Sequence, residues 1–125
     1  MTYIKVKLQV PGFHRWANAP ERYEYLRKKH RHVFHITILI KVDKSRQIEF
    51  IDFKDWVSRL INYNFAQDTE LPTHTNFQSM SCEQIAEQIS EFMRESWNES
   101  KFSMGFISSI EVSEDDENSA IVTWG

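Results

Sequence analysis

The chain has 125 residues, 41% of them hydrophobic, so residues 1–125 are expected to form a single domain around one apolar core. Eighteen acidic and fifteen basic residues give a formal net charge of −3, which argues against general nucleic-acid binding. The single cysteine excludes an internal disulfide and a thiolate zinc cluster, so the five histidines would have to hold any metal. No secretory or membrane-spanning segment is recognisable, and we expect a soluble cytoplasmic protein.

Two β-strands are predicted in the first third of the chain. Residues 3–10 alternate strictly between polar and apolar side chains, as a half-buried strand does, and Pro11 and Gly12 are expected to end it. A charged, tyrosine-rich excursion with room for one or two helical turns follows. Residues 30–42 are rich in β-branched side chains, and they predict a second strand.

An amphipathic helix and a long loop are predicted next. Residues 48–51 are expected to be extended, and Asp52 is expected to be the N-cap of a helix. The apolar stripe of this helix runs over residues 53–61 with helical spacing. Residues 62–79 contain a proline and little periodicity, which indicates a long loop, and loops of that length are often functional.

A second helix and two further strands complete the predicted fold. Ser81 and Gln84 form a capping box, and an apolar stripe behind them predicts a helix that ends near Trp97. Residues 104–112 and 119–124 have strand character and flank an acidic turn. The order ββααββ predicts the α+β class, with an antiparallel four-stranded sheet and both helices on one face.

Three of the histidines are candidate metal ligands. His30 and His32 lie in the second predicted strand, whose two-residue period directs both imidazoles to one side, whereas His35 is expected to point away. A catalytic zinc site usually has three protein ligands and one open position. His14, just after the first strand, is the natural third ligand if the two strands pair antiparallel. The alternative is that these are ordinary surface or packed histidines.

Five short segments match the motifs of one known family. They are Gly12-Phe13-His14, His30-Arg31-His32, Phe50-Ile51-Asp52-Phe53, Met80-Ser81-Cys82-Glu83 and Ile110-Glu111-Val112-Ser113-Glu114. In these segments, which span nearly the whole chain, the protein resembles the 6-pyruvoyl-tetrahydropterin synthase and 6-carboxy-tetrahydropterin synthase (QueD) family. The resemblance implies the tunnelling fold, or T-fold, with subunits joined edge to edge into a homo-oligomeric ring, a trimer or a hexamer.

The resemblance also implies a pterin site. His14, His30 and His32 would hold zinc as the cofactor, and Glu114 would anchor the ring of a reduced pterin. A carboxylate can accept two hydrogen bonds from the amino and ring N–H edge of a pterin. Ser81 lies in the segment that lines the family's pterin pocket. The implied activity is that of a lyase, which rearranges the side chain of a substrate like dihydroneopterin triphosphate with help from the metal.

The chain departs from the family in its proton-transfer residues. Leu26 occupies the position of the usual catalytic cysteine, and Thr69 follows Asp68 where the family has an Asp-His pair. Three residues could substitute: Cys82 at the start of the second helix, where the helix dipole lowers a thiol pKa, His74 in the long loop, or Asp68 itself. Each could instead be structural, as a helix-start, exposed loop or turn residue.

Two further functions stay open beside the lyase. A non-catalytic relative would bind or sequester a pterin, purine or nucleotide-like ligand, and the loss of the cysteine and histidine favours that interpretation. The histidines could also only stabilise a ring that serves as a scaffold. A basic run could contact phosphate or form a solvated face, and Trp16 could stack on a heterocycle or fill the core. The basic residues of the run are Arg27, Lys28, Lys29 and Arg31.

Overall fold

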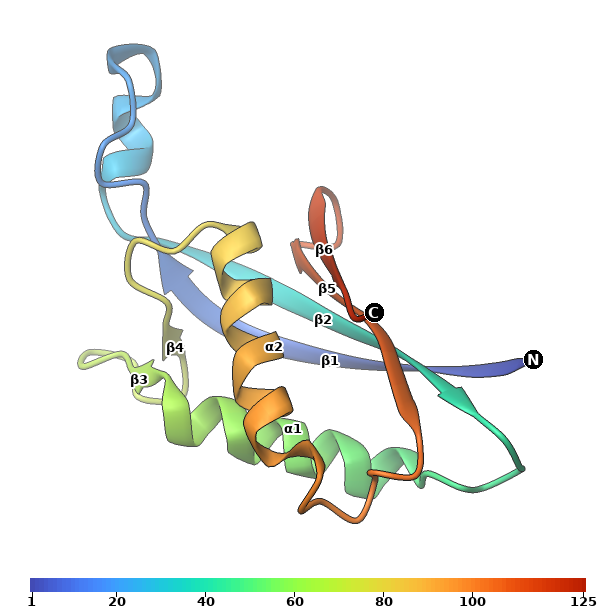
Figure 1. Ribbon diagram of the computed structural model, residues 1–125. Coiled ribbons are helices and arrows are strands. Elements are labelled where there is room, and N and C mark those ends of the chain that lie inside the picture. The colour runs from blue at the N-terminus through green and yellow to red at the C-terminus, as the bar shows by residue number, and fades with distance from the viewer.

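The computed structural model describes residues 1–125 as one six-stranded sheet with two α-helices (Figure 1). The strand order in the sheet is β3-β4-β1-β2-β5-β6. The elements are β1 (Thr2–His14), the 3-10 helix η1 (Glu21–Arg27), β2 (His30–Val42), α1 (Phe50–Asn64), β3 (Ala66–Gln67), β4 (Thr75–Asn76), α2 (Cys82–Trp97), β5 (Phe106–Glu114) and β6 (Ser119–Thr123). The α+β class is as predicted, but the sheet has six strands rather than four.

β1 and β2 form a long antiparallel pair, in register from Thr2 opposite Val42 to His14 opposite His30. β1 does not end at Pro11 and Gly12 as predicted. The backbone groups of the odd-numbered residues at this end of β1 point away from β2, since the Phe13 carbonyl accepts a hydrogen bond from Phe77 N–H. The missing N–H of Pro11 therefore removes no bond from the β1–β2 ladder, and the strand continues through it.

Both α-helices cover the same face of the sheet, with α1 over β1 and α2 over β5 and β6 (Figure 1). The strict alternation of the strands directs their apolar side chains to this face, where they meet the apolar stripes of the helices. A single core cluster contains 22 buried residues, and Phe34, Ile36 and Ile38 of β2 lie at its centre, fully buried. Each such side chain contributes about 1.5–3 kcal/mol on burial.

The N-terminus of α2 was predicted correctly from the sequence, and that of α1 was not. Glu49, not Asp52, is the N-cap of α1, and its carboxylate accepts the N–H of Asp52 at 2.7 Å. Residues 50–51 are therefore helical rather than extended. Their apolar side chains suggested a strand, but both are exposed in the first turn. The predicted capping box of α2 is present, since Ser81 and Gln84 each accept the backbone N–H of the other.

The region predicted as a long loop adds an edge to the sheet. α1 continues to Asn64, and β3 and β4 then pair with each other. β4 also lies parallel to β1, with Gly12 opposite Thr75. At the other end of the chain, β5 begins and ends two residues later than predicted, and its turn into β6 places Asp115 at a positive φ of 52°.

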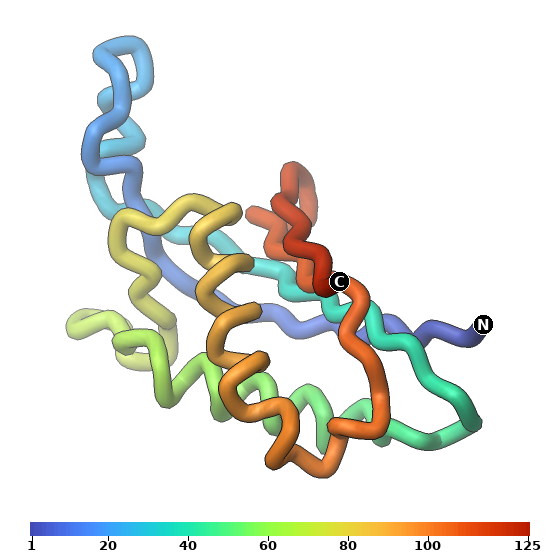
Figure 2. The backbone as a smooth tube through the Cα atoms, viewed as in Figure 1, coloured from blue at the N-terminus to red at the C-terminus, as the bar shows by residue number.

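Residues 15–29 leave the end of the β1–β2 hairpin as a separate arm (Figure 2). The arm contains η1, so the helical turns expected in this excursion are present. Trp16 is 47% exposed and stacks on Tyr23 within the arm, with ring centroids 6.0 Å apart, so it does not fill the core. None of the helices is long and apolar enough to cross a lipid bilayer.

Candidate metal centre

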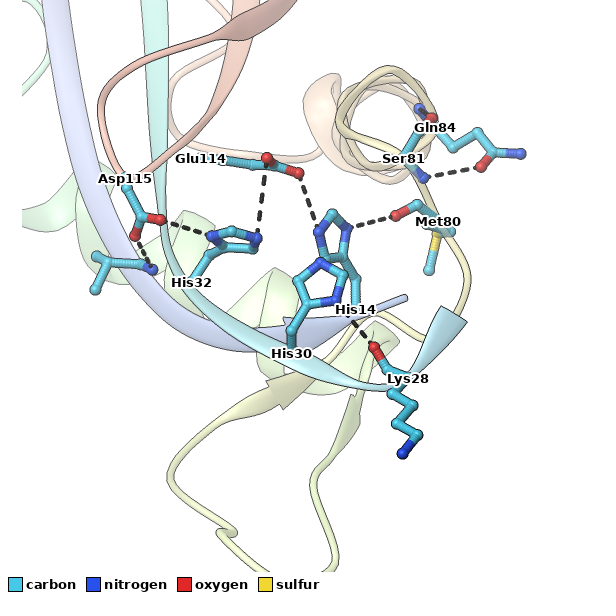
Figure 3. A network of polar contacts seen from close by, with 10 residues as sticks. His14, Lys28, His30, His32, Met80, Ser81, Gln84, Glu114 and Asp115 are labelled. Carbon is cyan, nitrogen blue, oxygen red and sulfur yellow. Dashed lines mark hydrogen bonds and ion pairs between the residues drawn. The ribbon is translucent and has the colours of Figure 1, made fainter. Parts of the chain in front are cut away.

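The three histidines predicted as ligands meet at the end of the β1–β2 hairpin (Figure 3). His14 lies directly opposite His30, and His32 follows two residues later on the same face. Each of the three offers a ring nitrogen, and these nitrogens lie within 4.8 Å of one another. Ligand atoms around a tetrahedral zinc ion lie about 3.3–3.6 Å apart, so the rings need only a modest inward rotation to hold one.

Each imidazole is fixed by a hydrogen bond at its Nδ1 atom. Carbonyl and carboxylate oxygens can only accept, so each Nδ1 donates, and the lone pair of a neutral ring then lies on Nε2. This is the arrangement that orients histidines in known metal sites, where the nitrogen that is not bound to the metal donates to an acceptor in the protein. The acceptors are Met80 O for His14 at 2.9 Å, Lys28 O for His30 at 2.9 Å and Asp115 Oδ2 for His32 at 2.6 Å.

Glu114, the last residue of β5, directs its carboxylate at the same point. Its Oε1 lies 3.0 Å from His14 Nε2, and its Oε2 lies 3.9 Å from His32 Nε2. Burial alone would lower the pKa of His14, but the hydrogen bonds to Glu114 and Met80 outweigh burial and raise it. His14 likewise lowers the pKa of Glu114, whereas desolvation lowers the pKa of His30. In the metal-free protein, His14 and Glu114 thus each favour the charged form of the other.

A cavity of about 600 Å³ opens beside the histidines, a size that suits a small-molecule ligand. Its lining includes ionisable side chains such as Arg15 and Glu114, so polar groups are at hand to orient a ligand in it. The start of α2 forms one wall and the arm forms another. The lining includes Arg15, Trp16, Leu26, Ser81, Cys82 and Glu83 together with the three histidines and Glu114.

Of the three substitutes for the family's proton-transfer residues, only Cys82 lines this cavity. Its thiol lies in the same cavity wall as the Glu114 carboxylate. Burial, reinforced by the negative charge of Glu114, raises the pKa of Cys82 to about 12. The expectation that the helix dipole would lower this pKa is therefore wrong. The thiol is protonated at neutral pH and is not a nucleophile in the metal-free protein.

Asp68 and His74 do not line the cavity of their own chain. Asp68 is buried, accepts a hydrogen bond from Lys29 Nζ at 2.9 Å and accepts two backbone N–H groups of its own loop. His74 Nε2 accepts from Arg31 Nε at 2.9 Å, and its ring packs on Phe13. Both residues thus anchor the loop between β3 and β4 to the hairpin.

The basic run makes contacts within the chain. Lys29 is paired with Asp68, Arg31 donates to His74, and Arg27 Nε donates to Ala19 O at 2.8 Å. None of these three residues lines the cavity beside the histidines, whereas Arg15 does. The sequence analysis missed Arg15, and it also missed Asp115, whose only sequence signal is its place next to Glu114.

Among solved structures with a similar fold, the uncharacterized protein WS1659 from Wolinella succinogenes aligns over 98% of this chain and 97% of its own, with a TM-score of 0.69 and 13% identity. The 6-pyruvoyl tetrahydropterin synthase (PTPS) of Plasmodium falciparum aligns over 98% of both chains, with a TM-score of 0.54 and 16% identity. No protein-family model and no curated protein matches the chain. At such identities the similarity establishes a fold like that of PTPS.

Proposed function

We propose that this protein binds zinc through His14, His30 and His32 and accepts a reduced pterin in the adjoining cavity, where its side chain is rearranged. The observation that carries the proposal is the convergence of three imidazoles, each with Nδ1 fixed by an acceptor, so that Nε2 is the nitrogen that would bind a metal. Zinc would polarise a hydroxyl or carbonyl of the pterin side chain. The fold similarity to a PTPS and the resemblance of the motifs support a pterin as the ligand.

The residues of the chain would position the heterocycle. Ser81 and Arg15 supply a hydroxyl and a positive charge at the cavity wall, and the exposed Trp16 ring offers a flat apolar surface. The Glu114 carboxylate is the acceptor suited to the amino and ring N–H edge of a pterin. These groups come from the arm, from α2 and from β5, so the cavity depends on the whole fold.

A second candidate is binding without turnover. It is favoured because the cavity lacks an evident base from its own chain: Asp68 and His74 hold the neighbouring loop, and Cys82, which does line the cavity, has a raised pKa. Such a protein would bind or sequester a pterin, purine or nucleotide-like ligand beside the metal.

The protein is further expected to assemble as a homo-oligomeric ring. β4 pairs with β1 only at Gly12 and Phe13, so the edge of β1 before them is unpaired in the isolated chain, as is the outer edge of β6. Pairing of these two edges between neighbouring subunits would cover both. Light scattering on the purified protein would distinguish a trimer or hexamer from a monomer, which would contradict this proposal.

Metal analysis of the purified protein tests the metal site. We expect about one zinc per chain in the wild-type protein and a large loss of zinc in His14→Ala. His35→Ala is the matched control, because His35 lies in β2 with the opposite parity to His30 and His32. Equal metal content in all three proteins would refute the proposed ligands.

Incubation with dihydroneopterin triphosphate, followed by mass spectrometry of the products, separates the two candidates. Products that depend on His14 would support the lyase. Binding of the pterin without products, measured by calorimetry, would support the second candidate and refute the first.

A further inference from the structure

The point on which the three imidazoles converge has a fourth protein group, the carboxylate of Glu114 (Figure 3). Its two oxygens lie 3.0 Å from His14 Nε2 and 3.9 Å from His32 Nε2. These two distances bracket the separation of about 3.3–3.6 Å between neighbouring ligand atoms of a tetrahedral zinc site. The carboxylate thus borders the point of convergence, at distances from two of the three imidazoles that are close to those of a fourth ligand.

The backbone around Glu114 holds its carboxylate in this place. Glu114 is paired with Phe34 across the sheet, and its N–H donates to Asn118 O at 3.1 Å, which closes the β5–β6 turn. The next residue is tied to β2, since Asp115 Oδ1 accepts the N–H of Val33 at 2.9 Å. Glu114 therefore projects from a rigid strand end, as the histidines do, and not from a free loop.

We infer that Glu114 is the fourth ligand of the metal in the ligand-free protein, so that the resting site has three histidines and one carboxylate. The inference rests on the proposed zinc site of the three histidines. Carboxylate oxygen is a regular zinc ligand at about 2.0–2.2 Å, and a carboxylate reduces the net charge of the bound ion from +2 to +1. A half-buried site with one anionic ligand is less costly to desolvate than one with none.

This assignment changes how the cavity would work. A site with four protein ligands has no open position, so an incoming hydroxyl or carbonyl must displace one of them. Glu114 is the ligand best placed to leave, because it is the only one of the four that is not an imidazole fixed at Nδ1. A pterin ring that captures the Glu114 carboxylate would at the same moment open a coordination position for its own side chain.

The Glu114→Gln variant tests the inference, because it keeps the size of the side chain and removes its charge. Glu83→Gln is the matched control, since Glu83 also lines the cavity but has no hydrogen bond to a histidine. Zinc affinity is measured by competition with a chelator, and the cobalt(II)-substituted proteins are compared by visible absorption. Thermal unfolding of the metal-free proteins checks that both variants fold.

We expect Glu114→Gln to weaken zinc binding by about tenfold or more, as losses around metal sites typically do, and to change the cobalt spectrum. Glu83→Gln should change neither.

Unaltered affinity and spectrum in Glu114→Gln would overturn the inference while leaving the three-histidine site intact. A crystal structure of the zinc-loaded protein gives an independent readout that needs no variant. Water in the fourth position, with Glu114 turned away, would likewise overturn the inference. Failure of the three-histidine site itself would be recognised separately, as zinc content that is unaffected by His14→Ala.

Discussion

The imidazole of His32 and the carboxylate of Asp115 are joined by a hydrogen bond of 2.6 Å between Nδ1 and Oδ2. The other oxygen of the same carboxylate accepts the N–H of Val33, which lies next to His32 in β2. The hydrogen bond from His32 is the main cause that lowers the pKa of Asp115, so the carboxylate stays ionised. Asp115 thus fixes both the tautomer and the orientation of one candidate ligand.

Substitution of this orienting residue should weaken metal binding. We expect Asp115→Asn to lower zinc affinity by about 10–100-fold, because the amide is a poorer acceptor for His32 Nδ1 than the carboxylate. Asparagine tolerates the positive φ of 52° at this position, so the turn should persist. Chelator competition gives the affinities.

Asp116→Asn is the control for this experiment. Asp116 also has a positive φ, of 60°, but its side chain makes no hydrogen bond, so zinc affinity should be unchanged. Equal affinities in Asp115→Asn and Asp116→Asn would show that His32 needs no such partner.

The thiol of Cys82 should be unreactive in the metal-free protein. With a pKa of about 12, about one thiol in ten thousand is ionised at pH 8, against about a quarter of ordinary thiols. Iodoacetamide should therefore alkylate the folded, chelator-treated protein far more slowly than the urea-unfolded protein, as followed by mass spectrometry. Cys82→Ser should retain metal and any turnover within a few-fold. Rapid alkylation of the folded chain would restore Cys82 as a candidate nucleophile.

Asp68 should contribute to stability at neutral pH and lose that contribution in acid. The hydrogen bond from Lys29 is the main cause that lowers the pKa of Asp68 from 3.8 in the folded protein. A carboxylate with a lowered folded-state pKa stabilises the fold above its unfolded pKa, and this contribution disappears as the pH falls through the folded value. Asp68→Asn should therefore unfold at lower urea than the wild type near pH 7, and the difference should shrink as the pH falls below 3.8.

A matched comparison is Asp55→Asn, which removes the exposed ion pair of Asp55 with Arg59 one turn later in α1. Exposed pairs of this kind contribute little, so its unfolding curve should stay close to that of the wild type. A pH-independent difference for Asp68→Asn would mean that its charge is not what stabilises the loop.

Elements with strong local signals were predicted well from sequence. β2 has the predicted bounds, because its run of β-branched and apolar residues is long and continuous. The capping box marked the start of α2. The two-residue strands β3 and β4 carry no detectable period, so the segment that contains them was predicted as a loop. Residues 50–51 were predicted to be extended but are helical, because exposed apolar side chains in a first helical turn resemble those of a strand.

The site residues likewise differ in whether a local sequence pattern predicts their positions. The two-residue spacing of His30 and His32 is local, and the antiparallel pairing that brings His14 to them follows from adjacent strands. The contact of Glu114 with His14 joins residues a hundred positions apart, and it depends on the register of β5 against β2, which includes a bulge. No local pattern encodes that register. The structural roles of Asp68 and His74 could not be predicted for the same reason. Their partners Lys29 and Arg31 lie about forty positions earlier in the chain, near the start of β2.

Gly12 should be irreplaceable at the edge of the sheet, although its backbone conformation is an ordinary one. A Cβ atom added there would lie 2.8 Å from Thr75 O and 2.9 Å from the Phe77 ring, both closer than van der Waals contact allows. The carbonyl belongs to β4, so it can retreat only if β4 separates from β1. We expect Gly12→Ala to lower the free energy of unfolding by about 1–3 kcal/mol, measured with urea, and to reduce zinc affinity by displacing His14.

Gly105→Ala tests whether this effect is specific to the close backbone contact. Its added Cβ would come within 2.8 Å of Ile48 Cδ1, the end of a side chain that can rotate away, so its cost should be smaller. It also lies far along the chain from the histidines, and zinc affinity should be unchanged. A Gly12→Ala protein that unfolds at the wild-type urea concentration would show that β4 can move outward freely. In that case the position of the β3–β4 loop, with Asp68 and His74, would not be set by its contact with β1.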